Sequence, residues 1–296
     1  MNRTNGKERS VTRSLQEYLR GIAGGLIFSL PLLYTMEVWW AGFTMHPLRL
    51  FIYVLTTFTL LLAYNRYAGL RCDPNPLEVA IDSVEEMGLG LLIAASFLWL
   101  IGQITVEMTV NEIVGKIIVE AMTVAIGVSV GTAQLGGGGQ QNTDSGMENE
   151  SSQSGSSPVP FLAGESDFMR QVTVALCGAI LFAANVAPTE EIVVIATQIA
   201  SRKLLVLALV SILLGALILF YSDFTGTQRF SQKKGIKTTI FGAIVTYAIA
   251  LVASATTLWF FGRFDNMPLI ICLAETVVLG LAATLGASAG RLLLQQ

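Results

Sequence analysis

Charged residues are scarce in this chain. Only 13% of its 296 residues are Asp, Glu, Lys or Arg, about half the share that is usual in a soluble domain. Apolar residues make up 53% and are concentrated in long runs. A soluble globular fold is therefore excluded, and the composition indicates a protein that crosses a membrane several times.

Cysteine and histidine are also rare. Cys72, Cys177 and Cys272 have no paired or metal-binding spacing, so neither a disulfide framework nor a Cys/His metal site is expected. The single histidine, His46, is expected at the surface. The chain lacks the phosphate-binding, zinc-protease and hydrolase motifs and has no strong basic patch. We therefore expect neither an enzyme nor a nucleic-acid-binding protein, and no cofactor.

Eight apolar runs are long enough to cross a bilayer, which takes about 20 residues per helix. The sequence thus predicts an all-α integral membrane protein with about eight transmembrane helices. The predicted helices cover residues 21–43, 47–64, 88–105, 113–133, 169–192, 204–221, 236–261 and 267–292.

Basic residues lie mostly on one side of these predicted helices. That side holds Arg3, Lys7, Arg9, Arg13, Arg20, Arg66, Arg71, Arg229, Lys233, Lys234, Lys237 and Arg291. The other side holds Arg49, Lys116, Arg202, Lys203 and Arg263. Because basic loops stay in the cytoplasm, we expect a protein of the cell (inner) membrane with both termini cytoplasmic.

The two halves of the chain resemble each other. "GGLIFSLPLLYTMEVWW" (24–40) aligns with "GAILFAANVAPTEEIVV" (178–194), "FLWLIGQI" (97–104) with "TLWFFGRF" (257–264), and "EAMTVAIGVSVG" (120–131) with "ETVVLGLAATLG" (275–286). Three blocks in the same order predict two four-helix repeats, and an even helix number makes them parallel. The predicted parts are a cytoplasmic tail (1–20), a first repeat (21–133), a disordered cytoplasmic linker (134–166) and a second repeat (167–296).

Glu120 and Glu275 occupy matching positions in the predicted fourth helices. Gly127 and Gly131 follow Glu120 on the same helical face, and Ala282 and Gly286 follow Glu275 in the same way. Since small residues let helices approach closely, the two fourth helices are predicted to meet with their carboxylates converging. The alternative places each glutamate at the outer interface, where it would only snorkel or cap.

A second set of polar residues surrounds the segment "FAANVAPTEEIVVIA" (182–196). Pro188 would break this helix, and the freed carbonyls and side chains could then bind a cation. Pro188 has no counterpart in the first half, which predicts a break in the second copy alone. The alternative is a short surface helix that begins near Thr189, with its acids in water. The candidate ligands are Glu37, Asn185, Thr189, Glu190 and Glu191.

Acidic residues also cluster in "DPNPLEVAIDSVEEMGLG" (73–90). Glu78, Asp82, Glu85 and Glu86 fall on one helical face. The simpler interpretation is a cytoplasmic, amphipathic segment that leads into the third helix. The other is an acidic vestibule that concentrates cations at the inner mouth.

With the duplication, the "PTEE" step and the fourth-helix glutamates, the chain resembles a family of uncharacterised bacterial integral membrane proteins. This resemblance implies a membrane location and eight helices, and it assigns no activity. "APTEEIVVIA" also resembles the proline–glutamate step in a broken helix of calcium/cation antiporters. Those proteins have inverted repeats and a Gly/Asn-rich segment after the step, which this chain lacks.

The leading hypothesis is a transporter or exchanger of small cations (H⁺, Na⁺ or Ca²⁺) that uses intramembrane glutamates. Carboxylates without a Cys/His set favour such hard cations. The alternative is a non-transporting membrane scaffold or sensor whose linker recruits cytoplasmic partners. Expected partners are membrane lipid and a small cation. The sequence leaves open whether the chain forms a homo-oligomer and which metal, if any, it binds.

Overall fold

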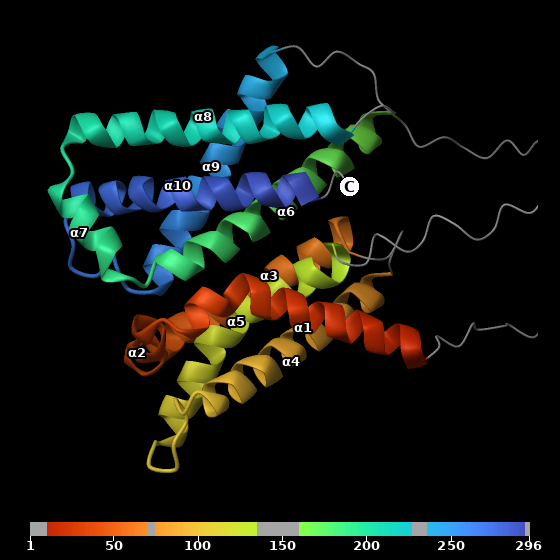
Figure 1. Ribbon diagram of the computed structural model, residues 1–296, viewed down its shortest axis with the longest axis vertical. Helices are drawn as coiled ribbons and strands as arrows, with labels where there is room; N and C mark the ends of the chain where they lie inside the picture. Colours follow the sequence, from red (N-terminus) through yellow and green to blue (C-terminus); the bar gives the residue numbers. More distant parts are fainter. Residues whose placement is uncertain (1–10, 70–74, 135–159, 227–235, 294–296) are drawn as a thin grey trace, which may run out of the picture.

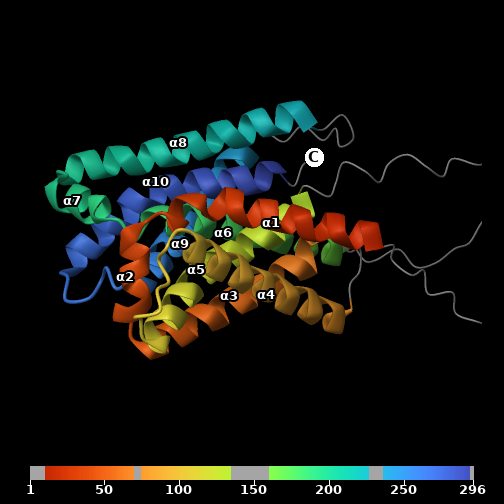
Figure 2. The same ribbon diagram turned by 60° about the horizontal axis from the view of Figure 1, so that its bottom comes forward.

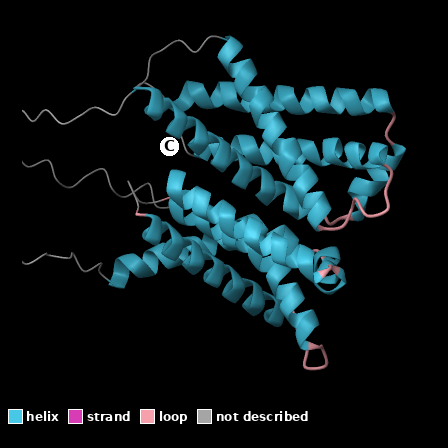
Figure 3. Ribbon diagram, turned by 180° about the vertical axis from the view of Figure 1, so that it is seen from behind, coloured by secondary structure: helices cyan, strands magenta, loops and turns pink. Residues whose placement is uncertain are grey.

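A helix closes its backbone hydrogen bonds within itself, as lipid requires, and the long apolar runs of this chain are helical. The computed structural model describes residues 11–69, 75–134, 160–226 and 236–293, which contain helices and loops (Figures 1 and 3). The helices are α1 (Val11–Leu33), α2 (Met36–Thr44), α3 (Pro47–Tyr67), α4 (Pro76–Leu100), α5 (Val110–Gln134), α6 (Pro160–Val186), α7 (Glu190–Gln198), α8 (Ser201–Gly226), α9 (Ile236–Phe260) and α10 (Leu269–Leu293).

Within these ranges, seven helices are long and apolar enough to cross a membrane. They are α3, α4, α5, α6, α8, α9 and α10. Counting α1 and α2 as one bent span gives eight. The prediction of an all-α membrane protein with about eight spans is therefore confirmed.

Several helix ends follow from local chemistry. Pro47 and Pro76 stand at the first positions of α3 and α4, where the missing N–H costs nothing. His46 caps α3, because its Nδ1 accepts from the Leu48 N–H at 3.2 Å. Gly102 and Gly262 follow α4 and α9 with φ of 76° and 71°, a left-handed conformation that favours glycine and ends a helix.

The predicted boundaries need three corrections. Residues 21–43 and 169–192 are not single helices, since each run contains a break. The tail is already helical from Val11, while residues 1–10 lie outside the described ranges. Helix α6 begins at Pro160, so 160–166 belong to a helix, and linker residues 135–159 lie outside the described part.

The helices of each half pack together in a similar way. In the first half α5 packs on α1, α2, α3 and α4, and in the second half α10 packs on α6, α7, α8 and α9. Figure 1 shows the two groups one above the other, and α2 and α7 lie at the same end in Figures 1 and 2. Parallel halves would give this placement. The repeat itself stays a prediction.

Glycines bring α5 onto α1 and α10 onto α6. A Cβ on Gly24 would lie 2.7 Å from the Gly127 carbonyl oxygen and would overlap the Gly131 backbone. In the second half, a Cβ on Gly178 would overlap the Gly286 backbone. No larger residue fits at these crossings, so the helix backbones are in direct contact.

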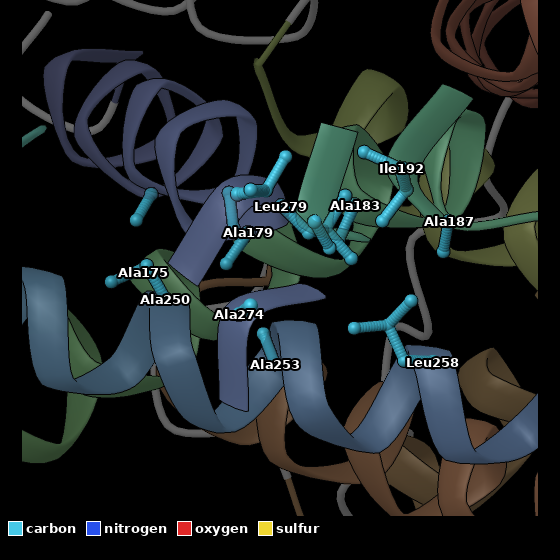
Figure 4. Close-up of a cluster of buried hydrophobic side chains, with 14 residues drawn as sticks. Ala175, Ala179, Ala183, Ala187, Ile192, Ala250, Ala253, Leu258, Ala274 and Leu279 are labelled. Atoms are coloured by element: carbon cyan, nitrogen blue, oxygen red, sulfur yellow. The ribbon is translucent and has the colours of Figure 1, made fainter. Parts of the chain in front are cut away.

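The second half also packs through alanine. Four alanines at four-residue spacing, three on α6 and one directly after it, pack in the apolar cluster that α6 forms with α9 and α10 (Figure 4). They are Ala175, Ala179, Ala183 and Ala187. These short side chains let α6 pack closely on α9 and on α10, the helix that carries Glu275.

An ion pair joins the two halves at the end where α2 and α7 lie. Arg49 at the start of α3 contacts Asp265 in the α9–α10 loop through two bonds of 2.6 Å each. The Arg49 guanidinium also lies 5.3 Å from the centre of the Trp259 ring. The hydrogen bond from Arg49, together with its positive charge, holds the pKa of Asp265 below its usual range.

The glycine crossing predicts a specific loss of stability. Gly24→Ala should destabilise the folded protein by about 1–3 kcal/mol, because the new methyl group meets backbone that cannot move aside. Gly88→Ala is the matched control, since a Cβ at Gly88 meets nothing within 4 Å. Thermal unfolding in nanodiscs, followed by tryptophan fluorescence, measures both. Equal melting temperatures for the two variants would contradict the close crossing.

The Arg49–Asp265 pair predicts a pH-dependent contribution. Because the folded pKa of Asp265 is lowered, the stabilisation exists at neutral pH and is lost as the pH falls below about 4. Asp265→Asn should lower stability at about pH 7 by at most about 1 kcal/mol, since the pair is partly exposed, and by much less at about pH 3. Glu107→Gln, an exposed loop acid, is the control. A deficit that stays constant across this pH range would argue against the ion pair.

Candidate functional site

The first helix break lies between α1 and α2, which are bent by 86° relative to each other. Pro31 stands in the last turn of α1, where it removes a backbone donor. The Thr35 hydroxyl donates to the Pro31 carbonyl at 2.7 Å, and the Trp39 indole donates to the Leu33 carbonyl at 3.2 Å. Side chains therefore satisfy carbonyls that the end of α1 leaves without intrahelical donors.

The second break lies between Val186 at the end of α6 and Glu190 at the start of α7. The N–H and the hydroxyl of Thr189 both donate to the Val186 carbonyl, at 3.1 and 2.8 Å. The predicted break around Pro188 is confirmed. The expectation that only the second copy is broken is wrong, because Thr35 occupies the matching position in the α1–α2 break.

The glutamates next to the breaks stand in the first turns of the short helices. Glu190 and Glu191 are exposed at the start of α7, and Glu37 is half-buried in the first turn of α2. There the carboxylates interact favourably with the helix dipole. This is the placement that the surface-helix interpretation expects, and a ligand role for these three acids stays a prediction.

Asn185 ties α6 to α1. Its Nδ2 donates to the carbonyls of Phe28 at 2.9 Å and Leu181 at 2.6 Å, and its Oδ1 accepts from the Leu32 N–H at 2.8 Å. In an ordinary helix the Leu32 N–H and the Phe28 carbonyl pair with each other. The amide thus bonds to α1 at the turn that precedes its break. Its role as a neutral cation ligand stays a prediction.

Glu120 lies at the centre of the first half. Its side chain is 0% exposed, and neither carboxylate oxygen has a hydrogen-bond partner among the described residues. Trp39 of α2 and Tyr53 of α3 lie close to it. The indole N–H lies within electrostatic reach of the carboxylate but donates to the Leu33 carbonyl at 3.2 Å, and the Tyr53 hydroxyl shares a hydrogen bond of 3.1 Å with Thr123.

Glu275 is the matching residue of the second half. It is also 0% exposed, and both of its oxygens lack a partner in the part of the chain that the structure describes. Arg263 in the α9–α10 loop is near enough to interact with it electrostatically. The Arg263 Nε is itself buried without a hydrogen-bond partner. Both glutamates are thus buried within the helix bundle, and their role as cation or proton ligands stays a prediction.

The two glutamate helices do not meet as predicted. The small-residue stripe of α5 packs on Gly24 of α1, and that of α10 packs on Gly178 of α6. Helix α6 packs on both α5 and α10. The stripe was expected to join α5 to α10, but each helix uses it to approach the broken helix of its own half. Each buried glutamate thus belongs to a helix packed tightly on a broken helix.

The described residues bring no larger set of acids together. Among them, no group of three or more His, Cys, Asp or Glu side chains is placed to hold a metal ion. Calcium needs six to eight oxygen ligands, which usually include several carboxylates.

A further polar group was missed in the sequence. Asn65 of α3 donates to Glu86 at 2.7 Å and to Ser83 at 3.1 Å, and Ser129 of α5 donates to Asn65 at 3.5 Å. Glu86 had been grouped with the solvated acids of α4. Neighbouring residues on a helix point about 100° apart, so Glu86 and the exposed Glu85 cannot share one face. This spacing is the signal in the sequence that could have distinguished Glu86 from the solvated acids.

Lys116 is a second buried charge that sequence patterns did not single out as a site. It is 4% exposed and stands one turn before Glu120 on α5. Its Nζ donates to the Gln103 carbonyl at 3.1 Å and leaves Glu120 unpartnered. Glu112 nearby accepts from the N–H and the hydroxyl of Thr109, which caps α5.

Comparison with known proteins agrees with the membrane architecture. Neither a curated protein nor a solved structure matches the chain at a significant level. One family model matches residues 17–294, which is nearly the whole sequence and includes both broken helices and both buried glutamates. The chain belongs to this family, which is described as "Putative integral membrane protein (DUF2391)".

Proposed function

We propose that this integral membrane protein transports or exchanges a small cation, with Glu120 and Glu275 as the binding carboxyls. The observation that carries the proposal is that all four of their oxygens are buried without a hydrogen-bond partner. A bare carboxylate is expensive to bury, whereas a carboxyl that holds a proton or a cation is not. Such a group therefore has a reason to bind one.

The helix breaks support the same proposal. Each buried glutamate is on a helix that packs on a broken helix, and breaks at membrane depth occur where backbone lines a cavity or is buried in protein. The absence of a three-residue acidic group among the described residues favours H⁺ or Na⁺ over Ca²⁺. In this proposal the protein is not an enzyme, and its partners are lipid and the transported cation.

The proposed orientation places both termini in the cytoplasm of a cell with an inner membrane. The excess of basic residues on the terminal side supports it. The short helices α2 and α7, with Glu37, Glu190 and Glu191, would then face the outside. Asn185 and Thr189 would stabilise the backbone geometry next to the helix breaks and would not bind the cation.

Ion flux into proteoliposomes tests the proposal. Vesicles with an internal pH-sensitive dye receive a pH gradient, with and without Na⁺. Glu120→Gln and Glu275→Gln should each reduce flux at least about tenfold, because the amide cannot exchange a proton and binds a cation weakly. Glu191→Gln is the matched control at an exposed glutamate and should change flux by less than about twofold.

Two results would count against the transport proposal. One is unchanged flux in both buried-glutamate variants. The other is an equal loss in Glu191→Gln, which would move the site to the short helices. Glu120→Gln must also be checked for folding by size-exclusion chromatography, because an amide without partners is also costly to bury.

The alternative function is a membrane scaffold or sensor that does not transport. The exposure of Glu190 and Glu191 at the start of α7 favours it, since these acids lie at the surface of the helix bundle. A pulldown with the full chain and with residues 134–166 deleted tests this function. Interactors that vanish with the segment, in a protein without ion flux, would support the scaffold over the transporter.

A further inference from the structure

Glu86 lies in a polar group built by three helices of the first half. Asn65 of α3 donates from one amide nitrogen to Glu86 at 2.7 Å and to Ser83 of α4 at 3.1 Å. Ser129 of α5 donates to the Asn65 Oδ1 at 3.5 Å and also lies within reach of the Glu86 carboxylate. Asn65, Ser83 and Ser129 are buried. Glu86 itself is half-buried, and its carboxylate contacts these buried neutral groups.

These neutral partners suit a carboxyl that gains and loses a proton. When Glu86 is ionised, the amide N–H of Asn65 donates to it, as seen here. When Glu86 binds a proton, its new O–H can donate to the Asn65 carbonyl oxygen after the amide turns, or to the Ser129 hydroxyl. A hydrogen bond is therefore available in both states. An arginine or lysine partner would instead fix the ionised form.

The group lies apart from Glu120, toward the end of the first half where α3 and α5 end. Asn65 is near the end of α3 and Ser129 near the end of α5, whereas Glu120 lies next to Trp39 of α2. Glu120 and Ser129 are nine residues apart on α5, which is about 14 Å along the helix. The buried side chains of Leu61 and Ile126 pack in one apolar cluster that also includes residues of α6. One carboxyl thus lies at the centre of this helix group and the other toward the end where α3 and α5 end.

The geometry points to Glu86 as a second proton-binding site, which exchanges its proton at the end of the bundle where α1 begins. Its role in transport rests on the proposed function; its proton binding does not. Other titratable groups face Glu86 from the packed helices, namely Asp82 and Glu85 on α4, Tyr64 on α3 and Cys177 on α6. The α5 side contributes Ser129, which does not titrate.

Infrared spectroscopy of the full chain in nanodiscs tests the site directly. The carbonyl stretch of a protonated carboxyl is recorded over a pH titration in H₂O and in D₂O. Glu86→Gln should remove one titrating component, and Asn65→Leu should shift the frequency of that component and its midpoint. Ser129→Ala, a milder change, should shift the frequency in the fully folded protein. Glu85→Gln, at the exposed neighbour, should leave the component unchanged.

Three outcomes decide the inference. A spectrum of Glu86→Gln identical to that of the unsubstituted protein would overturn it. So would a component whose frequency is the same with Asn65→Leu and Ser129→Ala, because Glu86 would then not depend on the neutral partners. If the unsubstituted protein shows flux, Glu86→Gln should reduce it about tenfold, and Glu85→Gln should not. Lack of flux in the unsubstituted protein contradicts the proposed function and leaves the infrared result standing.

Discussion

Backbone groups inside lipid must find hydrogen-bond partners within the protein, and this constraint governs both helix breaks of this structure. Where α1 ends, the Thr35 hydroxyl and the Trp39 indole serve its last carbonyls. Where α6 ends, Thr189 serves the Val186 carbonyl twice. Asn185 adds bonds from α6 to the α1 turn before the first break. At both breaks, backbone carbonyls therefore accept hydrogen bonds from within the protein. The chain changes direction at each break before the short helix that follows.

The breaks in turn depend on close packing. Glycine contacts bring α5 against α1 and α10 against α6, so that a helix with a buried glutamate lies directly on a broken helix. A carboxylate at such a place is buried and has no hydrogen-bond partner from the described residues. Because the cost of an unpaired buried charge is several kcal/mol, a proton or cation is the simplest way to remove it. The two halves then differ in what lies near the carboxyl, since Arg263 is near Glu275, whereas no basic side chain of the described residues pairs with Glu120.

Much of this architecture could be predicted from residue patterns. Long apolar runs identified the spans, and the lone acids Glu120 and Glu275 were expected inside them. The Pro188 break was also expected, because proline removes a donor wherever it stands. The α1–α2 break was missed, since Pro31 lies inside the last turn and the run around it stays apolar. The meeting of α5 with α10 was wrong, because a stripe of small residues says that a helix approaches closely but not which helix it approaches.

The sequence by itself determined that the protein lies in a membrane, how many spans it has to within one, and which two carboxyls stand in apolar surroundings. Those properties follow from composition and from periods of one helix, which are local. Only the tertiary structure decided that the glycine stripes join each glutamate helix to a broken helix. It also decided that Asn65, Glu86 and Ser129 meet, and that Arg49 bonds Asp265 across the halves. Contacts between residues far apart in the chain depend on how whole helices pack, and no local pattern specifies that.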